Sequence, residues 1–266
     1  MSVKIPRALT IAGSDSSGGA GIQADLKTFS ALGVYGTCAV TALTSQNTLG
    51  IRGIVEIDPD FVSSQIRSVI LDIGVDVVKT GMLCNGAILS RVASDLEELG
   101  VKNLVVDPVM VSTGGRRLLD EEAVEALVGR LFALALVVTP NLREAEALTA
   151  MSIRCVDDMK RAAVALRRSG CKYVIIKGGH LEGAPVDLLF DGEKFREYGG
   201  IRRETVHTHG TGCTFASAIA AFMARGLAVE EAVGRAKAYV SAAIAPGLAL
   251  GGGVGPLHHF HEFYRF

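Results

Sequence analysis

The segment His207-Thr208-His209-Gly210-Thr211-Gly212-Cys213-Thr214 carries the clearest chemistry of the chain, and an apolar run over residues 215–223 follows it directly. A Gly-Thr-Gly turn that opens a buried helix exposes backbone N–H groups at the positive end of the helix dipole, where anions bind. Cys213 would lie in the first helical turn, where the same field favours a thiolate. The segment therefore predicts an anion-binding turn with a possible base, and phosphoryl transfer is the first hypothesis.

Polar residues follow three of the predicted strands and extend this chemistry. Asp107 ends a strand predicted over 103–107, and a carboxylate there needs a partner such as phosphate-bound Mg²⁺. Asn141 and Glu144 lie three residues apart in the first turn of a predicted helix, where they either join a magnesium shell or form a local capping box. Lys177 ends another strand, where it either pairs with phosphate or is a solvated charge. The spacing leaves both alternatives open.

A glycine-rich loop follows the first predicted strand and lets the backbone approach a ligand closely. It reads Gly13-Ser14-Asp15-Ser16-Ser17-Gly18-Gly19-Ala20-Gly21. Residues 19–24 also satisfy G-x-G-x-x-A, the fingerprint of dinucleotide-binding folds. However, no acidic residue lies about 20 positions further on to hold a ribose, and no Gly-Lys-Ser/Thr marks a P-loop. We interpret the loop as a small-molecule binding loop, with a dinucleotide as the weaker alternative.

Strand-like and helical runs alternate along the chain. This alternation predicts an α/β fold with a doubly wound, mostly parallel sheet covered by helices on both faces. The predicted strands are 7–13, 36–41, 75–80, 103–107, 136–139 and 172–177. The predicted helices are 22–32, 59–71, 86–99, 121–133, 142–150, 156–169, 214–224 and 229–247. A small hairpin over 185–198 is expected to close one edge, and residues 1–266 to form a single domain with its ligands beyond the carboxyl ends of the strands.

Composition restricts the class of protein. The 27 basic and 28 acidic residues nearly balance, and no basic block argues for nucleic acid. Hydrophobic residues make up 49% of the chain and the mean hydropathy is +0.35, yet no apolar run is long enough to span a membrane. The five cysteines are scattered without a C-x-x-C pair, and the N-terminus lacks an apolar signal-peptide core. We therefore expect a cytoplasmic protein.

Together, these segments resemble the hydroxymethylpyrimidine and phosphomethylpyrimidine kinases of thiamine biosynthesis, members of the ribokinase-like superfamily. The resemblance covers nearly the whole chain in the same order. Besides the segment 207–214, the matching stretches are 8–15, 17–28, 42–48, 79–83, 107–110, 139–145, 177–180 and 255–260.

The resemblance implies a reaction and a pyrimidine site. ATP, with Mg²⁺, would phosphorylate the hydroxymethyl group of 4-amino-5-hydroxymethyl-2-methylpyrimidine and then the resulting monophosphate. The implied pyrimidine contacts are Gly13, Ala20, Asp25, Gln46, Met82 and Val109. Asp25 and Gln46 would offer oxygen atoms to the amino group, while Met82 and Val109 would form apolar walls for the ring.

The resemblance also implies roles on the phosphate side. The N–H groups of Gly210, Thr211, Gly212 and Cys213 would neutralise the moving phosphoryl group. Asn141, Lys177 and Thr208 are expected to contact ATP or its phosphates, and Asp107 and Glu144 to hold the metal. Cys213 occupies the place where most of the superfamily carries an aspartate. It either accepts the proton of the substrate hydroxyl, if its pKa is lowered, or only lines the pocket.

Two other functions are kept as alternatives. A pyridoxal kinase on the same scaffold would also phosphorylate a hydroxymethyl group on a flat nitrogen ring. A non-catalytic nucleotide or vitamin sensor would keep the fold, although intact Asp107, Asn141, Glu144 and Cys213 argue against it. By analogy with the family, we expect a homodimer.

Other conspicuous residues receive structural interpretations. His258, His259 and His261 are expected to form a structural C-terminus rather than a metal site. His207 and His209 are expected to shape the anion-binding turn rather than carry protons. Residues 111–117 are either a flap that closes over substrate or an ordinary loop.

Overall fold

Apolar strands form one continuous nine-stranded sheet in the computed structural model, which describes residues 4–110, 119, 121–179, 181, 183 and 185–264. The strand order is β3-β2-β1-β4-β5-β6-β7-β8-β9. Every neighbouring pair from β2 to β7 is parallel, and β3, β8 and β9 add antiparallel edges. The strands are β1 (Arg7–Asp15), β2 (Tyr35–Asn47), β3 (Gly50–Glu56), β4 (Val77–Thr80), β5 (Leu104–Val106), β6 (Val137–Val138), β7 (Tyr173–Ile176), β8 (Val186–Phe190) and β9 (Phe195–Gly199).

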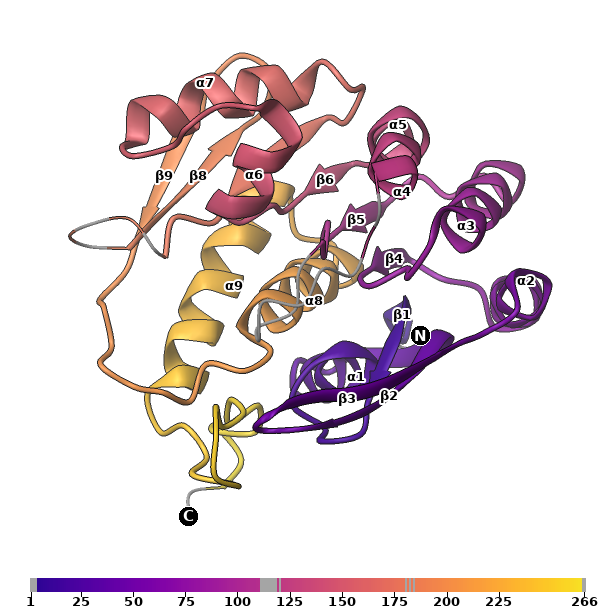
Figure 1. Ribbon diagram of the computed structural model, residues 1–266, viewed down its shortest axis with the longest axis horizontal. Helices are drawn as coiled ribbons and strands as arrows, with labels where there is room; N and C mark the ends of the chain where they lie inside the picture. The colour runs from indigo at the N-terminus through magenta and orange to yellow at the C-terminus, as the bar shows by residue number, and fades with distance from the viewer. Residues whose placement is uncertain are drawn as a thin grey trace.

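Helices cover both faces of the sheet (Figure 1). On one face lie α1 (Gly21–Ala31), α8 (Thr211–Ala224) and α9 (Val229–Ile244). On the other lie α2 (Pro59–Ser68), α3 (Gly86–Glu98), α4 (Glu121–Ala126), α5 (Phe132–Leu134), α6 (Leu142–Thr149) and α7 (Val156–Arg167). The π-helical segments Val69–Ile73 and Leu127–Leu131 continue α2 and α4. The predicted doubly wound α/β fold is confirmed.

The core has two apolar layers, one on each side of the parallel strands. Alternate residues of β1 point into different layers, with Leu9 and Ile11 in one and Ala8 in the other. Strands buried on both faces must be apolar at nearly every position. Helix α8 is buried over most of its length, which accounts for its almost continuous apolar sequence. The core therefore fixes α8 rigidly against the sheet, and with it the turn at its N-terminus.

The structure differs from the predicted elements mainly at one edge. The second predicted strand, 36–41, extends to Asn47 and pairs with β3, an edge strand that the sequence analysis did not identify. Most residues of β3 are partly or fully exposed, so its sequence has no clear alternation. The hairpin β8–β9 confirms the predicted opposite edge. Helix α8 begins three residues before the predicted helix, at Thr211.

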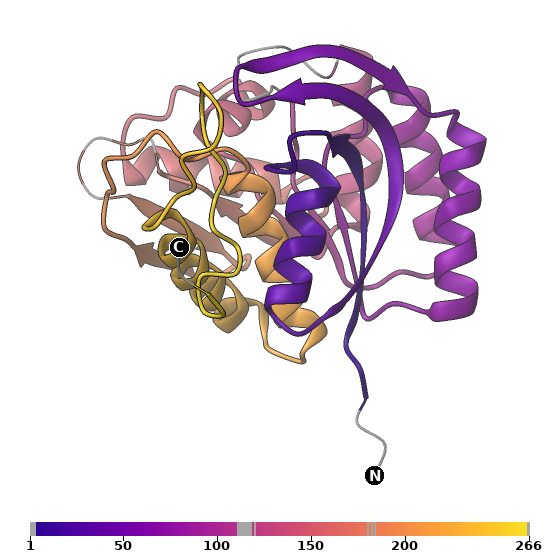
Figure 2. The same ribbon diagram turned by 90° about the horizontal axis from the view of Figure 1, so that it is seen from below.

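The turn of the β2–β3 hairpin contacts the end of the chain. In Figure 2 the hairpin arches over one end of the molecule, and the segment that follows α9 reaches it. The Val254 N–H donates to the Thr48 carbonyl oxygen at 3.0 Å, and the Gly253 N–H donates to Thr48 Oγ1 at 3.2 Å. Residues 17–28, 42–48 and 255–260, distant in sequence, are thus gathered around the N-terminus of α8.

Candidate active site

The N-terminal turn of α8 packs closely against the glycine-rich loop that follows β1. Gly210 precedes the helix with a φ of 83°, and a Cβ there would lie 1.8 Å from the Gly19 carbonyl oxygen. The Gly21 N–H lies near enough to the Cys213 thiol to lower its pKa. Only glycine permits this conformation and this close approach. The close approach brings the two predicted ligand-binding segments together.

The turn offers fewer free donors than the sequence predicts. The Thr211 N–H already donates to the Thr208 carbonyl oxygen at 3.2 Å. Within the described residues, the N–H groups of Gly210, Gly212 and Cys213 have no acceptor. Three of the four predicted N–H groups at the positive end of this fourteen-residue helix therefore remain available for an anion.

The charged residues at the ends of β5 and β7 meet beneath this turn. Lys177 Nζ donates to Asp107 Oδ1 at 2.7 Å, and Thr139 Oγ1 donates to the same oxygen at 3.1 Å. A Cβ at Gly212 would lie 3.4 Å from Lys177 Nζ and 3.7 Å from Asp107 Oδ2. The buried Asp107 counteracts the effect of burial and raises the pKa of Lys177, so the ammonium stays charged. An anion at the α8 turn would therefore meet a fixed positive charge.

Asn141 and Glu144 form the local capping box that the sequence left as an alternative. The Glu144 N–H donates to Asn141 Oδ1 at 2.9 Å, and the Asn141 N–H donates to Glu144 Oε2 at 2.8 Å. Burial raises the pKa of Glu144 to about 7, and the Asp107 charge adds to the rise while Lys177 opposes it. The cap does not exclude a metal role, because Glu144 lies close enough to Asp107 for the two charges to interact.

Cys213 is a neutral thiol in the ligand-free protein. Burial raises its pKa to about 11; the carboxylates of Asp25 and Asp107 also raise it, while the Lys79 ammonium and the Gly21 N–H lower it. Burial thus opposes the thiolate that the helix N-terminus was expected to favour, and the role of Cys213 as a base stays a prediction.

Asp25 is not available as a pyrimidine contact in this structure, which corrects the predicted role. Its side chain is fully buried, with Oδ2 accepting from Lys79 Nζ at 2.8 Å and Thr10 Oγ1 at 2.6 Å. Its Oδ1 accepts from Ser217 Oγ at 2.6 Å. Asp25 is thus the counter-ion of the buried Lys79, and it ties α1 to β1, β4 and α8. A buried ammonium needs such a partner.

The other predicted pyrimidine contacts lie where they could line a ligand site. Gly13 lies under the Met82 side chain, since a Cβ there would be 2.4 Å from Met82 Cε. Ala20, Gln46, Met82 and Val109 are each partly exposed, as the walls of a ligand site must be. The Val109 N–H donates to the Asp107 carbonyl oxygen at 2.8 Å, which turns the chain just after β5. These contacts stay predictions.

Two further predictions concern Thr208 and residues 111–117. Thr208 is exposed, and its carbonyl oxygen accepts both the Thr211 N–H and, at 2.7 Å, the Thr211 hydroxyl. Residues 111–117, expected to be a flap or an ordinary loop, lie outside the described residues. The contact of Thr208 with ATP stays a prediction.

Asp15 was not predicted from the sequence as a functional residue. The Asp15 carboxylate accepts from the N–H groups of Ser17 (2.8 Å), Gly19 (3.1 Å) and Ala20 (2.8 Å), and from His209 Nε2 (2.9 Å). Burial alone would raise the pKa of Asp15, but the hydrogen bonds from His209, Ser17 and Ala20 lower it to about 2. Asp15 therefore holds the glycine loop on the α8 turn. Its position inside that loop was the only available signal.

The histidines near the C-terminus have structural contacts, as predicted. His259 Nε2 lies 3.1 Å from Thr214 Oγ1 in the first turn of α8, and burial lowers the pKa of His259 to about 4. His258 Nε2 lies 3.0 Å from the Tyr264 carbonyl oxygen. Among the described residues, no group of three or more His, Cys, Asp or Glu side chains is arranged to hold a metal ion.

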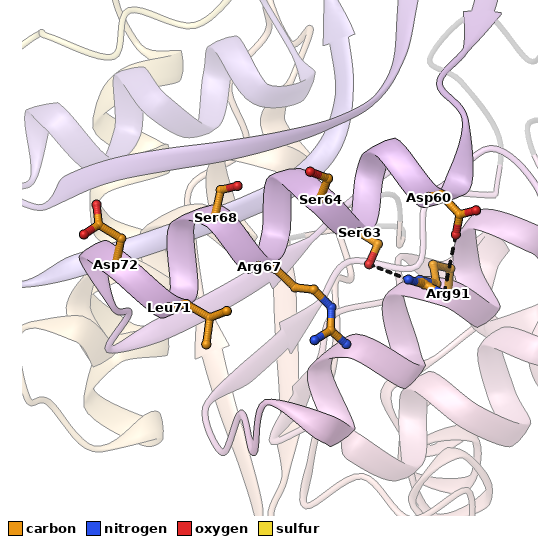
Figure 3. A pocket seen from close by; sticks show the side chains of 8 residues that line it. All are labelled: Asp60, Ser63, Ser64, Arg67, Ser68, Leu71, Asp72 and Arg91. Atoms are coloured by element: carbon orange, nitrogen blue, oxygen red, sulfur yellow. Dashed lines mark hydrogen bonds and ion pairs between the residues drawn. The ribbon is translucent and has the colours of Figure 1, made fainter.

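A hollow between α2 and α3 lies apart from this site (Figure 3). It is lined by Asp60, Ser63, Ser64, Arg67, Ser68, Leu71, Asp72 and Arg91. Its two arginines are paired, Arg91 with Ser63 Oγ at 2.9 Å and Arg67 with Asp95 at 2.8 Å. None of the predicted site residues lines the hollow.

Across the described part of the chain, no helix combines the length and apolarity that crossing a membrane requires.

Comparisons with known proteins agree with this geometry. The model of the phosphomethylpyrimidine kinase family matches residues 15–258. A hydroxymethylpyrimidine/phosphomethylpyrimidine kinase of Rhizobium meliloti is 50% identical over 262 residues, which cover 97% of this chain and 98% of that one. A thiamine biosynthesis bifunctional protein of Geobacter sulfurreducens is 52% identical over 252 residues, 94% of this chain, and the chain spans about half (51%) of that relative's length. Bacillus subtilis pyridoxal kinase, solved as an ADP complex, has a TM-score of 0.90 at 43% identity, covering 96% of this chain and 98% of that one.

Proposed function

The chain belongs to the phosphomethylpyrimidine kinase family, and from this membership we propose that it phosphorylates 4-amino-5-hydroxymethyl-2-methylpyrimidine and then its monophosphate. ATP is the phosphoryl donor, and the diphosphate product serves thiamine diphosphate biosynthesis. Membership of a kinase family argues against the alternative of a non-catalytic nucleotide or vitamin sensor. Residues 1–266 act as one kinase domain.

The observation that carries the proposal is the pairing of free backbone donors with a fixed charge. The N–H groups of Gly212 and Cys213 lie over the Lys177–Asp107 pair, with Lys177 Nζ 3.4 Å from the Cβ position of Gly212. Phosphoryl transfer is catalysed mainly by positioning and by neutralising charge on the phosphoryl oxygens. These groups supply both, and Asn141 and Thr208 are the further proposed contacts of ATP.

Asp107 and Glu144 fit Mg²⁺ by the chemistry of their donors. Magnesium in kinases is commonly held through one or two carboxylates, with phosphate oxygens and water completing the shell. Burial and the charge of Asp107 raise the pKa of Glu144, and a cation bound beside the two carboxylates would stabilise the ionised form of Glu144. When bound there, Mg²⁺ would neutralise charge on the ATP phosphates.

Cys213 is proposed as the proton acceptor for the substrate hydroxyl. Its Sγ lies at the junction of the glycine loop and the phosphate-binding turn, near the Gly21 N–H. The Lys79 ammonium favours the thiolate form, against the burial that raises the pKa to about 11. Because a base must be deprotonated to act, this role predicts a rate that rises with pH.

Pyridoxal is the second candidate substrate. The identity of 43% and TM-score of 0.90 to a pyridoxal kinase favour it specifically, because pyridoxal also carries a hydroxymethyl group on a flat nitrogen ring. We propose phosphorylation of pyridoxal as a side activity. By family analogy, the chain is also proposed to form a homodimer and to work in the cytoplasm; light scattering on a sizing column would test the dimer.

The decisive experiment incubates the protein with Mg-ATP and, separately, hydroxymethylpyrimidine, its monophosphate or pyridoxal, and follows the products by mass spectrometry. We expect the diphosphate from both pyrimidines. Failure to form the diphosphate from the monophosphate would contradict the thiamine assignment. Product from pyridoxal alone would replace the proposed function by the alternative.

A further inference from the structure

His209 joins three segments of the proposed site through one buried side chain. It directly precedes Gly210, and only 6% of its surface is exposed. Its Nε2 lies 2.9 Å from Asp15 Oδ2 and 3.2 Å from the amide nitrogen of Gln46. From the sequence, His209 was expected only to shape the anion-binding turn. Its contacts with Gln46, a proposed pyrimidine contact, point to a further role.

The two contacts of Nε2 make conflicting demands. A ring nitrogen either carries a hydrogen and donates, or has a lone pair and accepts. The Asp15 carboxylate can only accept, so Nε2 must donate to it. The amide nitrogen of Gln46 can only donate, so it cannot be bonded to the same Nε2. This conflict holds for the neutral Nε2–H ring and for the imidazolium alike, because both carry the hydrogen on Nε2.

Thr44 shows a second conflict on the other side of the same amide. Thr44 Oγ1 donates its single hydrogen to the Ser14 carbonyl oxygen at 2.9 Å, yet Gln46 Oε1 lies 3.2 Å from the same Oγ1. Two acceptors thus face one hydrogen. A half-turn of the Gln46 amide exchanges its oxygen and nitrogen, relieves the Thr44 conflict and replaces the two facing donors at His209 by one donor with two acceptors. The amide nitrogen then donates to Thr44 Oγ1, and the amide oxygen shares the His209 Nε2–H with Asp15 Oδ2 in a three-centre bond.

We propose that His209 is a positioning residue for pyrimidine recognition: its Nε2–H holds the Gln46 amide with the oxygen toward the α8 turn. One amide N–H and one oxygen lone pair of Gln46 then remain for a ligand. That pair complements an aminopyrimidine, whose ring nitrogen accepts and whose amino group donates. This inference rests on the proposed function, because it assumes that Gln46 faces the pyrimidine.

The same side chain links this recognition to the phosphate-binding turn. A Cβ at Gly19 would lie 2.4 Å from His209 Cδ2, so the ring packs directly on the glycine loop. The His209 N–H is bonded to the Gly255 carbonyl oxygen at 3.1 Å, which fixes the backbone. Movement of the ring would therefore shift Gln46 relative to Gly212 and Cys213. His209 does not contact the reacting atoms and acts through Gln46.

The kinetic test compares two substitutions. His209→Leu removes the donor, and we expect the KM for the pyrimidine to rise about tenfold while the KM for ATP changes less than about twofold. His209→Gln keeps an N–H donor at a similar reach and should recover most of the pyrimidine KM. His261→Leu, whose ring contacts His258 and Tyr239, is the matched control. Equal changes in both KM values, or no recovery in His209→Gln, would overturn the proposal.

A spectroscopic test needs neither activity nor a substrate. With ¹⁵N-histidine labelling of the wild-type protein, the Nε2 of His209, assigned by comparison with His209→Gln, should carry a hydrogen across neutral pH. An unprotonated Nε2 would overturn the proposal even if pyrimidines prove not to be substrates. Conversely, a protein that uses only pyridoxal would contradict the proposed function, and a protonated Nε2 in it would leave the donor to Asp15 and Gln46 in place; the orientation of Gln46 is then decided by the recovery of substrate KM in His209→Gln.

Discussion

Two buried carboxylates on either side of the α8 turn have opposite acid–base behaviour. Asp15, on the pyrimidine side, is 3% exposed, and hydrogen bonds overcome the effect of burial and lower its pKa to about 2. Glu144, on the phosphate side, is 6% exposed, and burial with the nearby Asp107 raises its pKa to about 7. Little of either side chain is exposed, but Glu144 lies deeper in the protein, so the loss of water raises its pKa more. The partners add to the difference: Asp15 has several donors and no neighbouring anion, whereas Glu144 has a carboxylate nearby.

The comparison teaches how the two halves of the site are prepared. On the proposed pyrimidine side, hydrogen-bond donors already satisfy the anion, so the loop holds its shape before any ligand arrives. On the proposed phosphate side, one lysine serves two carboxylates, and either a proton on Glu144 or a further cation completes the balance of charge. The pyrimidine side therefore keeps its shape without a ligand, whereas the phosphate side is stabilised by binding a cation.

The largest expected effect comes from Cys213, where the halves meet. If Cys213 is the base, Cys213→Ser should lower kcat by a factor of about 10² to 10⁴, because serine is a much weaker acid. The KM for pyrimidine should hardly change. The wild-type rate should rise with pH between about 7 and 10, toward the raised pKa of the thiol, and the variant should lose this slope. A small loss of rate with the slope intact would assign Cys213 to pocket lining.

Gly210→Ala should disrupt the contact between the α8 turn and the glycine-rich loop. The new Cβ would collide with the Gly19 carbonyl oxygen at 1.8 Å, so the turn and the loop must separate. We expect kcat/KM for both substrates to fall about a hundredfold, as displacement of positioning groups by about 1 Å does. Steady-state kinetics measures this effect.

Gly226→Ala is the control for Gly210→Ala. Gly226 has a φ of 91° at the end of α8, with no atom within 4 Å of its Cβ position. It should cost about 1 kcal/mol of stability from backbone strain and leave the kinetics intact. Equal kinetic losses in both variants would show that strain in α8, and not the contact with the loop, is responsible.

Lys177→Met should affect the phosphate side alone. It leaves Asp107 and Glu144 without their common cation, and it removes the charge expected to face ATP. The KM for ATP should rise about thirtyfold, with little change in the KM for pyrimidine. Lys172→Met, an exposed lysine just before β7, is the control. A rise in both KM values would contradict the separation of the two halves.

The last expected effect is on stability and leaves the rate aside, from Glu144→Gln in the ligand-free protein. The folded pKa of about 7 exceeds the ordinary 4.5, so the stabilising contribution of Glu144 is full below pH 4.5 and is lost as the pH rises through about 7. Glutamine keeps a capping side chain without titrating. The variant should therefore gain up to about 3 kcal/mol relative to wild type between pH 4.5 and above 7 in urea unfolding. Glu122→Gln, an exposed site on α4, should show no such trend.

Much of the fold followed from local pattern. Buried strands such as β1 and β7 are nearly continuous apolar runs, and the helices between them have regular apolar spacing, so both were predicted closely. The edge strand β3 was missed because its exposed residues carry no pattern. The capping box of Asn141 and Glu144 was also within reach, since both partners lie within one helical turn.

The sequence by itself determined the α/β class, the family resemblance and the set of strand ends that carry polar groups. Only the tertiary structure decided what those groups contact. The partners of Asp25 are 15, 54 and 192 residues away, and Asp15 and His209 are separated by 194. Likewise, whether Cys213 is a thiol or a thiolate depends on burial and on three charges, those of Lys79, Asp25 and Asp107, that lie far from it in sequence. Local patterns fix the backbone, whereas desolvation and pairing are properties of residues that only folding brings together.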